Sequence, residues 1–186
     1  MGYVKIASLP VLKETEKAVA VPKCYLFRKG LLKDNLQSIK EGEEVNLEGK
    51  GGACIICPPG WGKNYVLVAK NDYNGRTQLN WLPKSQVKID ALTNHVVAAK
   101  PWLVADRYIL MDYGEFKDAI IKATKLLCQE GIRTPFFWWG QIAPTLAKVT
   151  GVKHSGLIRT MLEAFTQLNN IDGDNVEEFI RKVCEE

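Results

Sequence analysis

The sequence predicts an α+β protein in which a β-rich N-terminal part precedes a helical C-terminal part. Up to about residue 112, short apolar runs are separated by Gly, Pro, Asn and Lys, a pattern typical of strands and turns. From Tyr113 onward, apolar residues recur at three- or four-residue spacing, as they do on one face of a helix. A chain of 186 residues is long enough for two small cores, because single domains commonly contain about 100–150 residues.

The β-rich part contains a regular series of candidate strands. They span residues 3–6, 17–21, 24–27, 43–47, 53–57, 65–70, 77–81 and 87–89. Strands at such regular spacing are typical of a small barrel or sandwich. Asn74-Gly75 lies between the runs that end at Lys70 and start at Thr77, and this dipeptide favours a tight hairpin turn. We therefore expect these two runs to pair antiparallel.

The helical part contains candidate helices at residues 113–129, 142–149, 155–168 and 175–184. Gly131 is expected to stop the first of them. The change of period puts the domain boundary between residues 90 and 112. The expected organisation is a β-rich domain at residues 1–100 followed by a helical domain at residues 101–186.

Residues 40–89 resemble an SH3-type small barrel. An acidic-Gly turn at residues 41–43 precedes a strand, and the stretch closes with Trp81-x-Pro83, where a 3₁₀ turn leads into the last strand of that family. Gln86 stands where the family's peptide-binding members have Tyr. The resemblance therefore implies an SH3-like barrel in the β-rich domain, but not a proline-rich ligand.

Residues 142–162 resemble a helix-turn-helix. That motif has an Ala on the first helix, a Gly four residues later and an apolar residue six further on, the intervals of Ala147, Gly151 and Leu157. The stretch from Gly131 to Leu162 contains basic residues but no Asp or Glu. The resemblance implies nucleic-acid contacts near the turn and on the outer face of the second helix, from Lys148, Lys153, His154, Ser155 and Arg159. Plain packing of two short helices through a Gly turn is the alternative interpretation.

Aromatic and basic residues also alternate within the predicted barrel. Rings can stack on bases, and Lys or Arg can neutralise phosphates. We therefore expect an accessory contact with nucleic acid from Trp61, Lys63, Tyr73, Arg76 and Lys84. In the competing interpretation, the rings fill the core of the small barrel.

Four consecutive rings stand at Phe136, Phe137, Trp138 and Trp139. Successive helical positions turn by about 100°, so four rings cannot all point inward from one helix. Some of them are expected either to form an exposed patch for a protein partner or to be covered at a domain interface.

Catalytic, metal and cofactor sites are not predicted. Cys54 and Cys57 form a lone CxxC without a second pair of zinc ligands, and residues 49–63 lack the Gly and the Ser or Thr that a Walker loop needs. The two histidines, His95 and His154, stand outside any nucleophile motif. We expect a protein that is not an enzyme and binds neither a metal nor a cofactor.

Composition gives an expectation for the cellular compartment. Five cysteines at irregular spacing predict free thiols in a reducing compartment, and hence a cytoplasmic location. The sequence has no apolar run of about 18 residues and no signal-peptide pattern, so no membrane association is expected. The formal net charge of +4 is mild, so it supports nucleic-acid binding only where the charges cluster.

Together these features give two hypotheses for function. The first is a nucleic-acid-associated regulator or accessory protein that binds DNA through the basic helical segment. The alternative is a protein–protein adaptor that docks on a larger assembly through the SH3-like barrel and the aromatic run. The expected partner is accordingly a nucleic acid or another protein.

Overall fold

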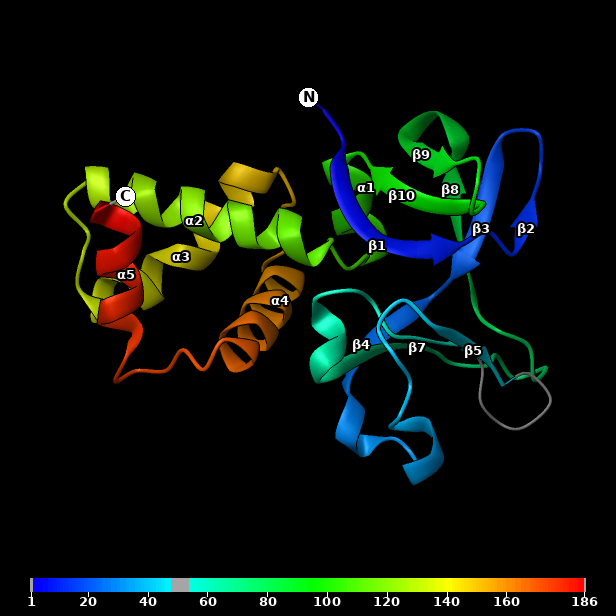
Figure 1. Ribbon diagram of the computed structural model, residues 1–186. Helices are drawn as coiled ribbons and strands as arrows, with labels where there is room; N and C mark the ends of the chain where they lie inside the picture. The colour runs from blue at the N-terminus through cyan, green and yellow to red at the C-terminus, as the bar shows by residue number, and fades with distance from the viewer. Residues whose placement is uncertain (1, 48–53, 186) are drawn as a thin grey trace. The chain divides into compact units, whose positions relative to one another are not determined.

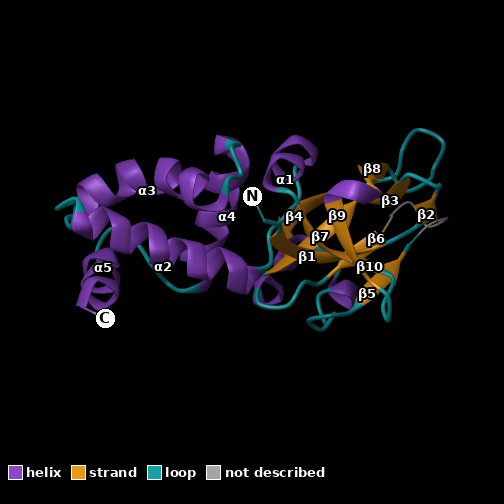
Figure 2. Cartoon of the chain, turned by 90° about the horizontal axis from the view of Figure 1, so that it is seen from above, coloured by secondary structure: helices purple, strands orange, loops and turns teal. Residues whose placement is uncertain are grey.

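The structure is a computed structural model that describes residues 2–47 and 54–185. It is an α+β protein with antiparallel sheets in its N-terminal part and helices in its C-terminal part, as the sequence predicts (Figure 1). The chain forms two compact units, Met1–Tyr113 and Gly114–Glu186. Figure 2 distinguishes the strands of the first unit from the helices of the second by colour.

The described part of the first unit contains antiparallel sheets of three, three and four strands. Their strand orders are β1-β10-β9, β2-β3-β8 and β4-β7-β6-β5. The strands are β1 (Val4–Pro10), β2 (Lys13–Glu14), β3 (Ala18–Pro22), β4 (Cys24–Arg28), β5 (Glu44–Asn46), β6 (Cys54–Ile56), β7 (Tyr65–Ala69), β8 (Leu79–Pro83), β9 (Val87–Asp90) and β10 (His95–Ala99).

The consecutive strands β3 and β4 pair with β8 and β7, respectively. The expected antiparallel pairing of the runs 65–70 and 77–81 is present only where they meet the turn, where the Gln78 amide donates to the Lys70 carbonyl at 3.0 Å. The strands β7 and β8 themselves are not neighbours, because β7 lies between β4 and β6 and β8 pairs with β3. The Asn74-Gly75 turn does form, with Gly75 at φ +75°, a conformation that suits glycine. It closes a short excursion between the two strands, in which Asn71 and Thr77 form an isolated bridge.

The closing turn of the SH3-like pattern is present in the structure. The 3₁₀ turn η4 (Lys84–Gln86) follows Pro83 and leads directly into β9. The stretch 40–89 is not self-contained, however, because β8 pairs with β3 and β9 pairs with β10. Strands from both sides of the stretch complete its sheets.

Helix α1 (Pro101–Arg107) belongs to the first unit. The amide before it, on Lys100, donates to the Gln86 carbonyl at 2.9 Å, and Arg107 Nε donates to the Trp81 carbonyl at 3.2 Å. Asn80 Nδ2 in turn donates to the Arg107 carbonyl at 3.1 Å. A division after residue 100 would separate α1 from these partners, whereas the compact units divide after Tyr113.

Trp61 lies in the core of the first unit. It opens the 3₁₀ turn η3 (Trp61–Lys63), and its ring is fully buried. Its Nε1 donates to the Met111 carbonyl at 2.9 Å, and the ring packs edge to face against Tyr113 with 5.1 Å between the centroids. A ring held in this way cannot stack on a base, so the expected nucleic-acid contact of Trp61 is wrong and the core interpretation is correct.

The second unit is helical. Its helices are α2 (Tyr113–Gln129), α3 (Pro135–Thr150), α4 (Ser155–Leu168) and α5 (Val176–Glu185). Phe116 of α2 packs edge to face against Phe165 of α4, with the ring centroids 6.2 Å apart. Trp138 of α3 packs in the same way against Phe179 of α5 at 6.0 Å. Aromatic contacts therefore tie these helices together in pairs.

Helix α3 begins at Pro135 rather than at residue 142, where the sequence places its start. Pro135 suits the first position of a helix, where its missing N–H is not needed. Pro144 consequently lies inside the helix instead of in its first turn. A proline there lacks the N–H that would bond back to the carbonyl of Gly140. The buried Trp138, four residues into the helix, offsets this cost through its packing.

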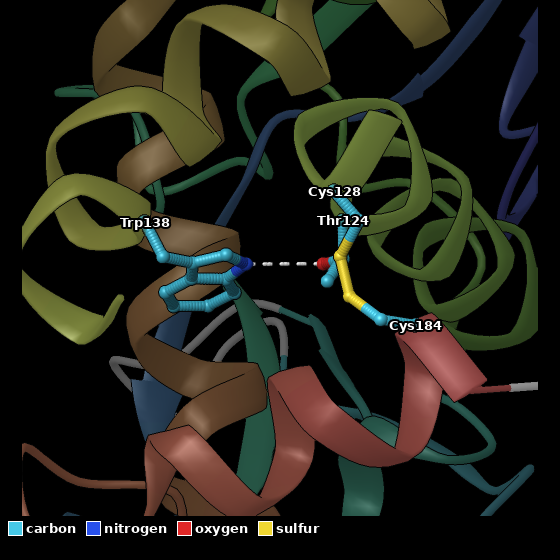
Figure 3. The surroundings of a disulfide bond; sticks show 4 residues. All are labelled: Thr124, Cys128, Trp138 and Cys184. Atoms are coloured by element: carbon cyan, nitrogen blue, oxygen red, sulfur yellow. Dashed lines mark hydrogen bonds between the residues drawn. A yellow bond between two sulfur atoms is a disulfide. The ribbon is translucent and has the colours of Figure 1, made fainter. Parts of the chain in front are cut away.

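A disulfide between Cys128 and Cys184 joins α2 to α5 (Figure 3). The Cα atoms of the two residues lie 6.1 Å apart, within the usual range for a disulfide. The expectation of five free thiols is therefore wrong for this pair, whereas Cys24, Cys54 and Cys57 carry thiols. The paired cysteines are 56 positions apart, and only the packing of α5 against the rest of the unit brings them together.

Candidate nucleic-acid interface

The turn between α3 and α4 has the form expected of a helix-turn-helix. Helix α3 ends at Thr150, and Gly151 follows with φ +75°, a left-handed conformation that favours glycine. The Gly151 amide donates to the Ala147 carbonyl at 2.9 Å, which closes the last turn of α3. Val152 is fully buried and anchors the connection in the core. The local structure around the predicted turn thus matches the expectation.

His154 caps α4. Its Nδ1 accepts a hydrogen bond from the Leu157 amide at 3.0 Å, so the imidazole satisfies one of the free amides at the start of the helix. A Cβ at position 156 would lie 3.1 Å from Cε1 of His154, and Gly156 leaves the room that the ring needs. The structure therefore gives His154 a capping role, and its Nδ1 is occupied.

The other residues predicted to contact nucleic acid lie on the surface of the second unit. Lys148 near the end of α3, Lys153 in the turn, and Ser155 and Arg159 on α4 are all exposed. Ser155 and Arg159 are four positions apart and share one face of α4. Leu157, on the opposite side, and Ile158, beside this face, are buried and hold the helix in the core. The polar face of α4 and the turn before it therefore present cationic groups to solvent.

The residues predicted for the accessory contact do not form one cluster. Tyr73, 97% exposed, and Arg76 lie in the excursion after β7, whereas Lys63 lies before β7 begins. Lys84 lies beyond β8 and forms an ion pair of 2.7 Å with Glu14. Their positions at different ends of β7 and β8 leave no single surface formed by the whole set.

The aromatic run divides between surface and core. Phe136 is 80% exposed, Phe137 58% and Trp139 37%. Trp138 is buried, and its Nε1 donates to Oγ1 of the buried Thr124 at 3.1 Å, close to the Cys128–Cys184 disulfide (Figure 3). Trp138 is therefore a core residue, which corrects its assignment to the partner patch. The remaining three rings are the exposed aromatic patch of α3.

Sequence reasoning missed an aromatic and basic surface on the first unit. Its main members are Tyr3, Lys100 and Trp102, which are distributed over both ends of that unit's sequence. Pairing of β1 with β10 brings Tyr3 next to Lys100. No local motif links these residues. The one signal of this surface in the sequence is that Lys100 and Trp102 lie two positions apart.

Cys24, Cys57 and His95 carry other side chains of the first unit with nucleophilic or acid–base chemistry. Burial raises the pKa of the Cys57 thiol, and burial together with the nearby Cys54 and Glu44 raises that of Cys24. Both shifts disfavour the reactive thiolate. His95 Nε2 lies 2.9 Å from a carboxylate oxygen of Glu44. Within residues 2–47 and 54–185, no group of three or more His, Cys, Asp or Glu is placed to hold a metal ion.

The same described residues include no helix with the length and apolar character needed to span a lipid bilayer. Comparison of the chain with protein-family models, curated proteins and solved structures gives no match. The geometry and chemistry of the surfaces described above are therefore the basis for a functional proposal.

Proposed function

We propose that this chain is a nucleic-acid-associated regulator or accessory protein, and not an enzyme, whose second unit binds DNA at the turn between α3 and α4. The observation that supports it most strongly is the common exposure of Lys148, Lys153, Ser155 and Arg159. They lie in a stretch, from Gly131 to Leu162, that contains no carboxylate side chain. A cytoplasmic location stays a prediction, although its premise of five free thiols does not hold for Cys128 and Cys184.

The proposed contacts are mainly with phosphates. Lys153 lies just before α4 begins, and Arg159 lies four positions after Ser155, the first residue of that helix. Both are exposed cations and would displace counterions from the DNA backbone. The positive end of the α4 dipole adds to the same field. In this proposal the exposed Ser155 hydroxyl donates to a phosphate or a base edge. His154 contributes by capping α4, which fixes the direction of that helix.

Charge reversal at the turn tests this proposal. The double substitution Lys153→Glu and Arg159→Glu is expected to lower the affinity for duplex DNA by at least about tenfold at low salt. The slope of log K against log salt should become shallower by about 2, because two phosphate contacts are lost. Fluorescence anisotropy of a labelled duplex at several salt concentrations measures both quantities.

The matched control is Lys117→Glu with Lys122→Glu, which makes the same change of charge at exposed positions on α2. This control should retain most of the wild-type affinity and salt slope. Equal losses in the two double variants would show that net charge alone attracts the DNA, and would contradict a site at the turn. Wild-type protein that binds no duplex at about 50 mM salt would also contradict the proposal.

The exposed aromatic patch of α3 supports a second candidate function, that of a protein–protein adaptor. Exposed rings of this size are typical of contact surfaces, and aromatic residues often dominate the energy of binding between proteins. Phe136 and Phe137 are the most exposed of the three rings. The patch lies on the first turns of α3, separate in sequence from the basic turn at its other end.

Substitution of the two phenylalanines tests the adaptor function. Phe136→Ser with Phe137→Ser should remove capture of a protein partner in pull-down experiments and leave DNA affinity within about twofold of wild type. The exposure of both side chains predicts a change in stability of no more than about 0.5 kcal/mol. Leu31→Ser with Leu92→Ser removes two exposed leucines from the first unit and serves as the control. Loss of the same partners from both variants would rule out a specific patch.

A further inference from the structure

The second unit contains a pocket of about 280 Å³. Its walls are formed by α2, α4, α5 and the connection between α4 and α5. Each of these four segments contributes one large apolar side chain to the lining, namely Ile121, Phe165, Phe179 and Ile171, respectively. Ligand pockets in proteins are mainly apolar and have volumes of about 300–1,000 Å³, so this one has the size for a small molecule.

The connection between α4 and α5 is held by its own hydrogen bonds. The Ile171 amide donates to the Thr166 carbonyl at 2.8 Å, just after Asn170 with φ +53°. Asn175 Nδ2 donates to the Asn170 carbonyl at 2.6 Å, and its Oδ1 accepts from the Asp172 amide at 2.8 Å. These bonds keep Ile171 in the wall of the pocket. A pocket formed before the ligand arrives costs little ordering on binding.

The two rings in the lining are held in position by neighbouring aromatic side chains. Phe165 packs edge to face against Phe116 of α2, with the centroids 6.2 Å apart. Phe179 packs in the same way against Trp138 of α3 at 6.0 Å. Two fixed rings in the lining favour an aromatic ligand over an aliphatic one, because pairs of rings gain binding energy beyond the burial of their area.

The charged side chains of the lining leave one positive charge in excess. They are Lys117 on α2 and Glu178 and Lys182 on α5. Lys182 Nζ lies 3.3 Å from Oε1 of Glu178, so these two charges balance. Among the described residues, Lys117 has no ion-pair partner. It lies four positions before Ile121 and shares that face of α2. A ligand with a single negative charge therefore matches the pocket.

We propose that this pocket binds a small aromatic carboxylate. The ligand ring packs against Phe165 and Phe179, and its carboxylate pairs with Lys117. A phosphate ester carries nearly two negative charges at neutral pH, more than the single excess positive charge offsets. The lining contains no residue of the α3–α4 turn, so this site is additional to the proposed duplex contact. Duplex binding is measured without this ligand, and the two proposals are tested independently.

Isothermal titration calorimetry of the full chain with naphthalene-2-carboxylate tests the site. Naphthalene-2-carboxamide has the same shape without the charge, and should bind about tenfold more weakly because it lacks the charge-assisted hydrogen bond. Lys117→Met should weaken binding of the carboxylate by about tenfold and leave binding of the carboxamide within about twofold. The matched control is Lys122→Met, which removes an exposed lysine of α2 outside the lining and should change neither affinity by more than about twofold.

A second variant locates the bound probe. Ile121→Glu places a carboxylate in the lining, four positions after Lys117, and should remove binding of naphthalene-2-carboxylate. Ile121 is only half-buried, and circular dichroism on heating checks that the variant is folded. Unchanged binding by folded Ile121→Glu would place the probe elsewhere and overturn the proposal. Equal affinities of wild type and Lys117→Met for the carboxylate, or no binding of it by wild type at millimolar concentration, would overturn it as well.

Discussion

Replacing Trp138 by Ala is expected to lower the free energy of unfolding of the second unit by about 3–5 kcal/mol. The indole is almost completely buried and packs edge to face against Phe179 of α5. Its removal leaves a cavity between α3 and α5 and takes away the hydrogen bond to the buried hydroxyl of Thr124. The lost packing and the lost hydrogen bond to Thr124 both lower the free energy of unfolding.

Denaturant unfolding followed by near-UV circular dichroism measures this effect, with hydrogen exchange of α2, α3 and α5 to locate it. Phe136→Ala is the matched control, because that ring belongs to the same run but is 80% exposed. The control should change stability by about 0.5 kcal/mol or less. A Trp138→Ala protein as stable as the control would mean that the ring is not buried in solution.

Loss of the Cys128–Cys184 disulfide is expected to destabilise the second unit by about 4 kcal/mol. The bond closes a loop across 56 positions of the sequence, and in the chain-entropy model a loop of this length strongly restricts the unfolded chain. Cys128→Ser with Cys184→Ser removes the bond while keeping side chains of similar size. Thermal unfolding of this variant should occur at a lower temperature than that of the oxidised wild type.

Reduction provides the internal control for the disulfide. A thiol reductant should lower the unfolding temperature of the wild type and leave that of the double serine variant unchanged. Alkylation of the unfolded, unreduced wild type should label the three thiols of Cys24, Cys54 and Cys57. Labelling of all five cysteines, counted by mass spectrometry, would contradict the bond.

Local signals in the sequence were sufficient for much of the second unit. The apolar period predicted α2 and α4, and the spacing of Ala147, Gly151 and Leu157 predicted the connection between α3 and α4. These signals work because a helix and its terminating glycine depend on residues within a few positions of each other. The predicted start of α3 is wrong, because Pro144 indicates a first turn in the sequence, whereas the packing of Trp138 extends the helix back to Pro135.

Contacts between distant residues could not be predicted in this way. Asn74-Gly75 correctly indicated a turn, but the partners of β7 and β8 are supplied by β4 and β3, some forty to sixty residues away in sequence. The same applies to the aromatic and basic surface of the first unit, where strand pairing places Tyr3 beside Lys88 and Lys100. Pairing of strands depends on the whole sheet, so no window of sequence contains the information.

By itself, the sequence determined the α+β class, the order of the two parts and the exposed cations of the α3–α4 turn. Each of these follows from the local period of apolar residues and from charge that stays in contact with water. Only the tertiary structure decided which rings are buried, so that Trp61 and Trp138 enter the cores while Phe136 and Trp102 stay exposed. It also decided the pairing of Cys128 with Cys184. The reason is that burial and disulfide formation depend on which distant segments pack together, and that is a property of the whole fold.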